Sequence, residues 1–370
     1  MPPPFSTAFA GPQNVYIPAF QGKQTANLVV SYARDPKKFA VNSLAQRIPT
    51  NTLSGNWLTL RPEVLARVMN DPNEVNWVDG QMSPDGTHNL QDFRANAYVC
   101  VRRARTAPLG WQTRDQAVWD IQDTQLQALA HQMMTQRAFA FYSVLANQAN
   151  YLSGNVKTAT QWSNIGGTGG FWTAGTSSNP VVKRAVLQMA NAIRKATMDA
   201  VAFGDMTLII SPSIAIALST SPEIHDYMAR SQYAKGVLNG DGPGAAWGLP
   251  LDNLYGVRLI VDGTLLTTSP RLVVPGTEVN ILNPTDPGNA NAGSDNVAYM
   301  IATPGSLGDN VGQVSSAFST VAMFVYNGEE MVVETLDEPW HKRTKLRVSE
   351  TYGFNIVAPE TACLATNILA

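Results

Sequence analysis

The chain has 370 residues, of which 44% are apolar and 15% are charged, and its formal net charge is −2. The apolar fraction supplies a sizeable core, and the near-neutral balance excludes a chain whose overall charge is strongly basic, as in many nucleic-acid-binding proteins. Because charged residues usually make up about a quarter of a globular chain, their scarcity favours a surface that neighbouring molecules cover, with a monomer coated by uncharged polar residues as the alternative.

Residues 1–52 are predicted to form an extended arm. Seven prolines interrupt the first fifty residues, so regular structure is limited to a short helical piece near residues 26–33. Apolar side chains are numerous enough to lie on another surface but too few to build a core. The arm is mildly basic, because one acid, Asp35, accompanies five cations; they are Lys23, Arg34, Lys37, Lys38 and Arg47. So weak an excess of positive charge is typical of a solvated tail.

Residues 53–108 are predicted to form a long hairpin. Residues 57–60 and 98–101 have the composition of two strands. Between them lies a polar, turn-rich segment with one short helix predicted over residues 62–70. A two-stranded hairpin is only marginally stable in water by itself. We therefore expect this hairpin to rest on another surface.

The stretch from Trp111 to Ser153 contains no glycine or proline, although the chain has 28 and 23 of them. It predicts one helix over residues 115–151, about 55 Å long at 1.5 Å per residue. Acidic residues in its first turns suit the helix dipole. One apolar face recurs at helical spacing; it consists of Val118, Leu126, Leu129, Met133, Ala140 and Val144. Such a helix is typical of extended subunits that pack side by side.

The remaining sequence predicts helices packed on mixed sheets, which makes the fold α+β. Asn179 and Pro180 begin a helix that extends to residue 200, and two further helices follow the caps Ser211 and Ser221. Strands are predicted over residues 206–210, 255–261, 297–302, 320–326, 331–336, 344–352 and 354–357. Asn327, followed by a glycine, predicts a hairpin turn between two of these strands.

The sequence contains no catalytic, metal or cofactor motif that we recognise. None of the four histidines has a ligand partner at helical spacing. A dinucleotide-like spacing of small residues near residue 242 has no strand before it and no helix after it. Cys100 lies in an apolar strand, which favours a buried, inert thiol, and with Cys363 it forms no disulfide framework. We expect no enzyme and no cofactor, and neither a secretory signal nor a membrane span is predicted.

Two clusters of charge are candidates for contacts between subunits. Arg102, Arg103 and Arg105 lie at the root of the predicted hairpin. The second cluster mixes cations and acids near the C-terminal strands; it consists of Glu329, Glu330, Glu334, Lys342, Arg343, Lys345 and Arg347. Arginine forks would give directional contacts between subunits. The alternative is solvated surface with weak cross-strand pairs, and the sequence favours neither.

Several phrases, taken in their order, resemble one known family. They are Phe39-Ala40 with Ile48-Pro49, HQMMTQRAFAFYSVLANQANY (131–151), LIISPSIAIALSTSPEIHDYM (208–228), LYGVRLIVDG (254–263) and TKLRVSETYGFNIVAPETACLATNIL (344–369). They are similar, in turn, to the arm's exit, the end of the spine helix, two passages of the axial domain and the C-terminal segment of the major capsid proteins of tailed bacteriophages. Those proteins have the Hong Kong 97-like fold, and the resemblance covers most of the chain.

The resemblance implies a plan for the domains. The predicted parts are an N-terminal arm (1–52), an extended loop (53–108), a peripheral domain with the spine helix (109–179 and 316–352) and an axial domain (180–315 and 353–370). It implies a structural protein that assembles as hexamers and pentamers into an icosahedral virion shell around double-stranded DNA, in the host cytoplasm. An encapsulin-like compartment shell of the same fold is the alternative, and a soluble α+β enzyme is a third hypothesis.

The resemblance also implies partners. They are other copies of the chain, packaged DNA bound without sequence preference, portal and scaffolding proteins, and a decoration protein; no membrane is expected. The arm's cations become candidates for a DNA-facing surface; they are Lys23, Arg34, Lys37 and Lys38.

Two departures from the family pattern modify these expectations. Some members join subunits by an isopeptide bond between an extended-loop lysine and an asparagine, but this chain has no lysine between Lys38 and Lys157. We therefore expect a shell without such links, in which hairpin arginines make ionic contacts instead; they are Arg61, Arg94, Arg102, Arg103 and Arg105. Because the arm is short, we expect scaffolding to be a separate protein or already removed.

Overall fold

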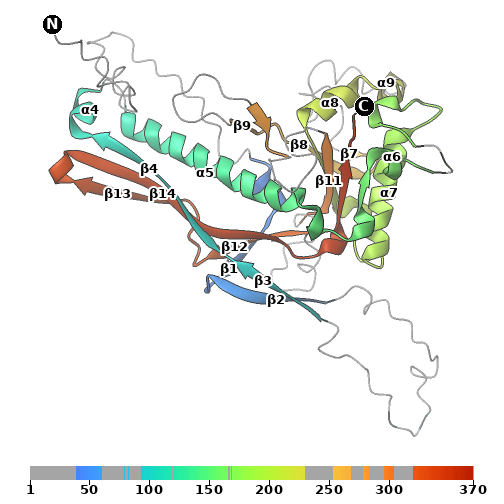
Figure 1. Ribbon diagram of the computed structural model, residues 1–370, viewed down its shortest axis with the longest axis horizontal. Helices are drawn as coiled ribbons and strands as arrows, with labels where there is room; N and C mark the ends of the chain where they lie inside the picture. The colour runs from blue at the N-terminus through green and yellow to red at the C-terminus, as the bar shows by residue number, and fades with distance from the viewer. Residues whose placement is uncertain are drawn as a thin grey trace.

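The computed structural model of the chain describes residues 39–60, 79, 82, 93–117, 120–165, 167, 169–229, 253–267, 278–282, 296–303 and 320–369. The arm up to residue 38 and the predicted helices near residues 26–33 and 62–70 lie outside the described residues. Helices and mixed sheets make up the described part, which confirms the predicted α+β class. A long helix lies along one sheet, and a second sheet with its own helices stands at one end of that helix. A hairpin projects away from the body of the molecule (Figure 1).

The first sheet is built around one long strand, β14 (Arg343–Ile356). β4 (Val101–Gly110) pairs antiparallel with it along one edge. β13 (Val332–Glu338) and β12 (Val321–Tyr326) follow one another along the opposite edge, both antiparallel to it. β1 (Gln46–Thr50) completes the sheet in parallel with β12. Side chains alternate between the two faces of β14, and the apolar ones, Leu346 and Val348, lie on the face that the long helix covers.

The long helix, α5, spans Ile121–Ala146 and is shorter than the sequence predicted. A separate short helix, α4 (Trp111–Gln116), precedes it, and Ala117 has an extended backbone. Asp120 is also extended, and its carboxylate accepts the N–H of Asp123 at 3.0 Å, which caps α5. The prediction of one helix over residues 115–151 is therefore wrong. The backbone of Trp111 donates to the carbonyl of Lys342 at 2.9 Å, so contacts with another part of the chain fix α4 independently of α5.

The buried face of α5 changes along its length. Leu129 and Met133 pack on the first sheet alone. Further along, the buried stripe also contacts the second sheet; it consists of Met134, Ala138, Phe141, Tyr142 and Leu145. The predicted stripe was partly wrong, because Ala140 and Val144 are only partly buried and Val118 lies outside the described residues. The C-terminal half of α5 is buried on more sides than a helix on a single sheet would be.

The second sheet has six strands in the order β5-β15-β11-β6-β8-β7. They are β5 (Val156–Thr158), β15 (Ala362–Thr366), β11 (Val297–Ala302), β6 (Met206–Ile210), β8 (Val257–Val261) and β7 (Asn253–Leu254). Its central strands are buried on both faces: Leu208 and Met300 point to one core, and Ile209 and Tyr299 point to the core shared with α5. This two-sided burial explains the continuous apolar runs in their sequences.

Four helices pack with this sheet on the side away from α5. They are α6 (Ala159–Trp162), α7 (Val181–Ala196), α8 (Pro212–Ser219) and α9 (Pro222–Ala229). The predicted cap Ser211 is confirmed, because its hydroxyl accepts the N–H of Ile214 at 3.2 Å. Asn179 does not cap α7 as predicted. The carboxylate of Glu223, from α9, accepts the N–H groups of Val182 and Lys183 instead, at 2.9 and 3.0 Å.

The predicted hairpin of residues 53–108 contains two paired strands, but their bounds differ from the predicted ones, 57–60 and 98–101. β2 (Ser54–Leu60) pairs antiparallel with β3 (Phe93–Val99), which leads through Cys100 into β4. Two smaller strands, β9 (Leu265–Thr267) and β10 (Glu278–Asn280), form a separate pair. A single helical turn, α2 (Val41–Leu44), precedes β1.

Two turns differ from the sequence prediction. Asn327 and Gly328 have φ values of 46° and 71°, as a tight turn requires, but β12 and β13 on either side do not pair with each other. Both pair with β14, whose 14 residues are long enough to hold them in succession. Tyr255 and Gly256 also have positive φ values, 53° and 89°, and they turn β7 into β8. The strand predicted over residues 255–261 therefore begins two residues later, at Val257.

The predicted domain plan stays a prediction, although three of its boundaries do not coincide with the ends of the two sheets. β5 and α6 were assigned to the peripheral domain, but β5 pairs with β15 in the second sheet. Residues 353–356 were assigned to the axial domain, but they pair with β12 in the first sheet. Residues 39–50 were assigned to an arm on a neighbour, yet they pack on the chain's own core, because β1 joins β12 and Phe39 is buried. The arm over residues 1–52 stays a prediction, and its first 38 residues lie outside the described residues.

Both cysteines are free and buried, as predicted for Cys100. The Cys100 thiol lies 3.5 Å from the carbonyl oxygen of Phe324, and burial raises its pKa. Burial also raises the pKa of Cys363. Neither thiol is therefore activated as a nucleophile.

Gly353 continues β14 where the sequence predicted two strands, over residues 344–352 and 354–357. It pairs with Phe324, and a Cβ at this position would overlap the carbonyl oxygen of Val99. Only a glycine lets β14 pass this closely under the junction of β3 and β4.

We predict that Gly353→Ala destabilises the fold by about 1–3 kcal/mol, because the added methyl group forces the two backbones apart. Thermal unfolding of the full chain measures this effect. Gly204→Ala is the matched control, since nothing lies within 4 Å of a Cβ there. Equal melting temperatures for the two variants would contradict the prediction.

Candidate functional site: an ion cluster and two exposed apolar surfaces

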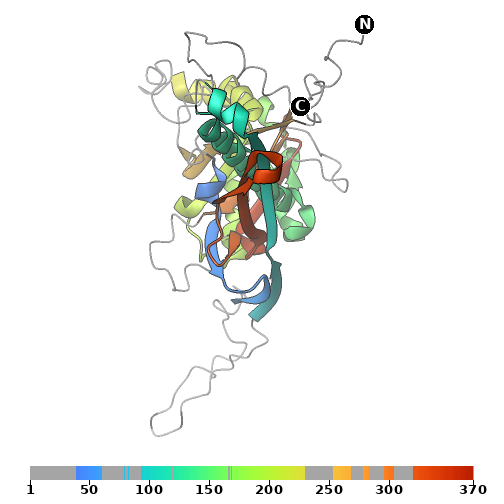
Figure 2. The same ribbon diagram turned by 90° about the vertical axis from the view of Figure 1, so that its left-hand side faces the viewer.

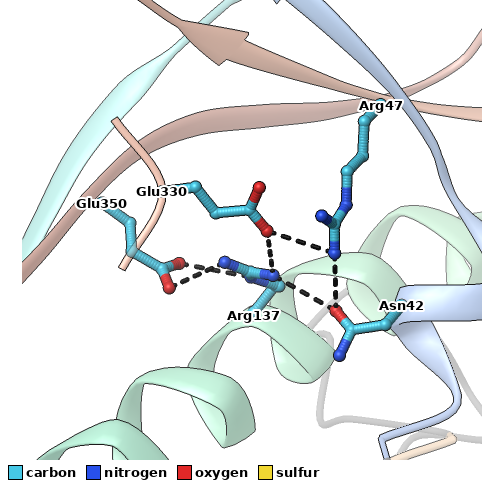
Figure 3. Close-up of polar contacts among 5 residues, drawn as sticks. All are labelled: Asn42, Arg47, Arg137, Glu330 and Glu350. Carbon is cyan, nitrogen blue, oxygen red and sulfur yellow. Dashed lines mark hydrogen bonds and ion pairs between the residues drawn. The ribbon is translucent and has the colours of Figure 1, made fainter. Parts of the chain in front are cut away.

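Arg137 lies at the centre of a cluster of charged side chains under the first sheet (Figure 3). Its guanidinium holds Glu350 through two bonds, Nε to Oε2 at 3.3 Å and Nη2 to Oε1 at 2.8 Å. Its Nη1 donates to Glu330 Oε1 at 2.7 Å and to Asn42 Oδ1 at 3.2 Å. Arg47 Nη2 lies 3.2 Å from the same Glu330 oxygen and 3.4 Å from the same Asn42 oxygen. The cluster joins four segments: the chain after the arm, α5, the β12–β13 connection and β14.

The cluster is buried at its centre and open at one side. Arg137 and Glu350 are each 1% exposed, whereas the Arg47 side chain is 49% exposed. Burial raises the pKa of Glu350, and the Arg137 guanidinium opposes that rise. Tyr352 lies beside the pair, with the guanidinium of Arg103 4.4 Å from its ring centre. Because two carboxylates face two guanidinium groups, the cluster carries no large net charge.

Sequence analysis missed Arg137 and Glu350 and assigned Glu330 a different role. Glu330 was a candidate for contacts between subunits, but its carboxylate contacts Arg137 within the chain. The available signal was the arginine itself, which is a lone charge in the apolar helical stretch MMTQRAFAFY. Its partners lie 193 and 213 residues further along the chain, so the sequence does not identify them.

The other acidic and basic candidates near the C-terminal strands lie on β13 and β14. Glu338 pairs with Arg343 at 2.6 Å and with Lys345, and Glu334 pairs with Arg347. Lys345 and Arg343 lower the pKa of Glu338. The Glu329 carboxylate accepts a hydrogen bond from the hydroxyl of Thr351. The backbone N–H of Lys342 donates to the carbonyl of Pro339 at the tip of the β13–β14 hairpin. These contacts fit the alternative of cross-strand pairs, and a role between subunits stays a prediction.

The hairpin arginines divide into two kinds. Arg94 pairs with Glu360 at 2.7 Å, and Arg103 donates to the carbonyl of Tyr352 at 2.9 Å. Arg102 and Arg105 are exposed, and within the described residues neither has an ion-pair partner. Arg61 and the arm's candidates lie outside the described residues; the latter are Lys23, Arg34, Lys37 and Lys38. Among the described arginines of this set, Arg102 and Arg105 are thus the exposed ones without an ion-pair partner.

The β2–β3 hairpin has one packed face and one open apolar face. Trp57 and Tyr98 stack toward Phe324, with ring centres at 5.2 and 4.4 Å. The opposite face presents Leu58 and Val99, which are 62% and 61% exposed, with the small side chains of Ala95 and Ala97 between them. We call these four residues the hairpin face. Figure 2 shows the hairpin leaving the body of the molecule below the first sheet.

A second apolar surface lies at the far end of the β13–β14 hairpin. Trp340 is 97% exposed in the short turn Pro339–His341. Leu336 and Val333, on β13, are also exposed, but they lie on opposite faces of that strand, so Trp340 is the apolar side chain of the tip itself. A large exposed aromatic side chain on a narrow tip is unusual for a surface that meets only water.

The described residues contain no group of side chains arranged to hold a metal ion. No helix among them is long and apolar enough to cross a membrane.

Comparison with solved structures shows which fold this is. A phage-related protein from Bordetella bronchiseptica RB50 has a TM-score of 0.58 at 13% identity, over 90% of this chain and 93% of that one. The capsid of cyanophage P-SCSP1u gives 0.56 at 12% identity, over 94% and 93%, and the mature capsid of bacteriophage PhiM1 gives 0.54 at 9%, over 93% and 90%.

The chain has the fold of phage capsid proteins. This capsid-protein fold spans both sheets, because the matches cover at least nine-tenths of the chain. At 9–13% identity, what is shared with those structures is the fold rather than the side chains. No protein-family model and no curated protein matches the sequence. The roles of individual residues in this capsid-protein fold are therefore argued from its own contacts.

We predict that Arg137→Met destabilises the chain by about 3–5 kcal/mol, because it leaves Glu350 buried without a counter-charge, whereas Glu330 keeps its pair with Arg47. Chemical denaturation of the full chain measures the change. Arg114→Met is the control, since Arg114 forms only an exposed pair with Asp115 and should contribute less than about 1 kcal/mol.

The double variant Arg137→Met/Glu350→Leu should recover much of the loss, because it removes the carboxylate that Arg137→Met leaves buried without a counter-charge. If the double variant were less stable than Arg137→Met, the loss would not come from uncompensated buried charge.

Proposed function

We propose that this chain is the major capsid protein of a tailed bacteriophage. Copies assemble as hexamers and pentamers into an icosahedral shell that encloses double-stranded DNA. The observation that carries the proposal is the likeness of fold to the capsids of PhiM1 and P-SCSP1u over nine-tenths or more of the chain. The chain then acts through burial between subunits, and we assign it no catalytic step.

The hairpin face supports a role in assembly. A two-stranded hairpin gains little stability by itself, and this one leaves Leu58 and Val99 open to water. Burying each of them against a neighbour would contribute about 1.5–3 kcal/mol. The exposed arginines at the root of the hairpin, Arg102 and Arg105, would then meet acids of the same neighbour. The partner that fits is another copy, because a closed shell brings the same surfaces together repeatedly.

Trp340 supports a second contact, at the opposite end of the first sheet. Aromatic side chains that fill a pocket on a partner often dominate the binding energy of an interface. Each subunit would thus contact copies through the hairpin face, the Trp340 tip and the arm. Individually weak contacts suffice, because a subunit in a closed shell makes several of them at once.

The remaining partners follow from the same proposal. Packaged DNA would meet the shell without sequence preference, and the basic residues of the arm are candidates for that contact. Portal, scaffolding and decoration proteins are expected in addition, and the virion capsid is the place of action, with assembly in the host cytoplasm. A compartment shell of the same fold would differ in its contents, which would be protein in place of DNA.

Electron microscopy of the purified full chain tests the proposal, and we expect closed icosahedral particles. Leu58→Asp should prevent their formation while leaving the fold intact, because it places a charge in the buried hairpin contact. Leu58→Met is the matched control, since it keeps an apolar side chain of similar size and should still assemble.

A folded chain that stays monomeric under all assembly conditions would refute the proposed function. Particles formed equally well by Leu58→Asp would refute the role of the hairpin face alone. Particles that contain cargo protein and no DNA would favour the compartment shell.

We further predict that mature particles contain no covalent links between subunits through a hairpin lysine, because no lysine lies between Lys38 and Lys157. Arginine does not replace the lysine amine as a nucleophile. Denaturing electrophoresis of mature particles should show a single monomer band. A ladder of covalent oligomers would contradict the prediction.

A further inference from the structure

One side of α7 carries cations and no acid. The apolar residues of this helix are fully buried against the second sheet. The other side, which we call the α7 face, consists of Lys183, Arg184, Leu187, Gln188, Asn191, Arg194 and Lys195. In Figure 1 the helix lies at the edge of the molecule, on the side of the sheet away from α5. Four cations on one helix are unusual in a chain with a net charge of −2.

Two of these cations lie where the helix itself disfavours them. Lys183 and Arg184 belong to the first turn of α7, at the positive end of its dipole, where a cation costs about 0.3–1 kcal/mol. The Glu223 carboxylate already caps this end through the backbone N–H groups. Arg184 donates to the Pro180 carbonyl and to Asn179 Oδ1, so contacts at the helix end account for that cation, whereas they do not account for Lys183.

The four cations of the α7 face differ in the contacts that they make within the chain. Arg194 lies 3.4 Å from Asp199, and Arg184 donates to the carbonyl of Pro180 at 3.1 Å. Lys183 and Lys195 are exposed, and the ion pairs of the described residues include neither of them. Two ammonium groups, one near each end of α7, are thus left for an anionic partner.

The chemistry of the α7 face fits a nucleic acid best. Lysine, arginine, asparagine and glutamine are the side chains that bind phosphate and sugar oxygens. A membrane surface fits less well, because α7 buries its apolar side in the protein, whereas an interfacial helix inserts that side into lipid. A protein partner also fits less well, because the face has no aromatic side chain to act as an anchor.

We propose that the α7 face binds the phosphate backbone of double-stranded DNA without regard to sequence. The inference rests on the proposed function, because a filled shell presses DNA against its inner wall, and it assigns the α7 face to that wall. Lys183 and Lys195 are twelve residues apart, about 18 Å along the helix. A duplex carries about one phosphate per 1.7 Å of its axis, so both lysines reach phosphates at once.

The test is the salt dependence of DNA binding by the full chain, kept below the concentration at which particles form. Fluorescence anisotropy with a labelled mixed-sequence duplex gives the affinity over a series of salt concentrations. For Lys183→Gln/Lys195→Gln we expect the slope of log K against log salt to become shallower by about 1.8, and the affinity near 0.1 M salt to fall roughly 50-fold. A duplex of scrambled sequence should give the same values.

Two control variants separate local charge from other causes. Arg102→Gln/Arg105→Gln removes two exposed cations from the first sheet and should leave the slope unchanged. Lys183→Arg/Lys195→Arg keeps the charge and should bind as the wild type does. An unchanged slope in the glutamine variant, an equal change in the Arg102/Arg105 control, or a loss in the arginine variant would each overturn the proposal.

Particle formation, followed by electron microscopy, separates this proposal from the proposed function. If wild-type particles form and the slope of Lys183→Gln/Lys195→Gln is unchanged, only the α7 inference fails. If no particles form, the proposed function fails whatever the duplex shows. If the variant binds the duplex normally but no longer assembles, the α7 face is a contact between copies, and the DNA proposal is wrong.

Discussion

Arg137 determines how distant parts of this chain are held against one another. It projects from the middle of α5 into a space where the segment after the arm, the β12–β13 connection and β14 all meet. Because the guanidinium is a rigid fork, it donates to Glu350, Glu330 and Asn42 at the same time only in one arrangement. Burying such a group costs desolvation energy that an apolar residue would not incur. We therefore interpret the cluster as a device that fixes geometry: with it in place, α5 cannot slide along the sheet.

The shape of the subunit follows from that fixed geometry. The C-terminal half of α5 lies in a core that both sheets share, whereas its N-terminal half covers one sheet only. The first sheet thus extends well beyond the shared core and ends in the Trp340 tip, and the β2–β3 hairpin leaves it on another side. Pieces that extend this far bury less apolar surface per residue than a compact domain does. Leu58, Val99 and Trp340 are the side chains that remain uncovered as a result.

The sequence was informative where structure is local. The strand over residues 206–210 and the strand over residues 297–302 were predicted with their observed bounds, because each is a short apolar run with clear ends. Ser211 was found as a cap because its partner is three residues away. Arg102 and Arg105 are exposed, and their role in contacts between copies stays a prediction.

Errors arose where a distant segment decides the local structure. Neither glycine nor proline marks the break between α4 and α5; the break depends on a bond from Trp111 to Lys342, which lies far along the chain. The tight turn at Asn327 was recognised, but the pairing of its flanking strands depends on the length of β14. Glu223 replaces Asn179 at the start of α7 because α9 folds back to that point. Arg137 was overlooked for the same reason, since all three of its acceptors are distant in sequence.

The distribution of the few charged residues connects the fold to the proposed function. Some pair with one another inside the molecule, as Arg137 and Glu350 do, and others form pairs across β13 and β14.

In a chain with so little charge, an exposed cation without an acidic partner on a described surface calls for an explanation, because a nearby acid would neutralise it at small cost. The described surfaces carry several such cations; they are Arg102 and Arg105 on the first sheet, Lys183 and Lys195 on α7, and also Arg258 and Lys342. A subunit of a closed shell has two kinds of surroundings, its neighbouring copies and the enclosed polymer. The arginine fork suits directional contact with a carboxylate of a copy, and the mobile ammonium suits a phosphate backbone that presents no fixed register. We therefore interpret Arg102 and Arg105 as suited to contact with copies, and Lys183 and Lys195 as suited to the enclosed polymer.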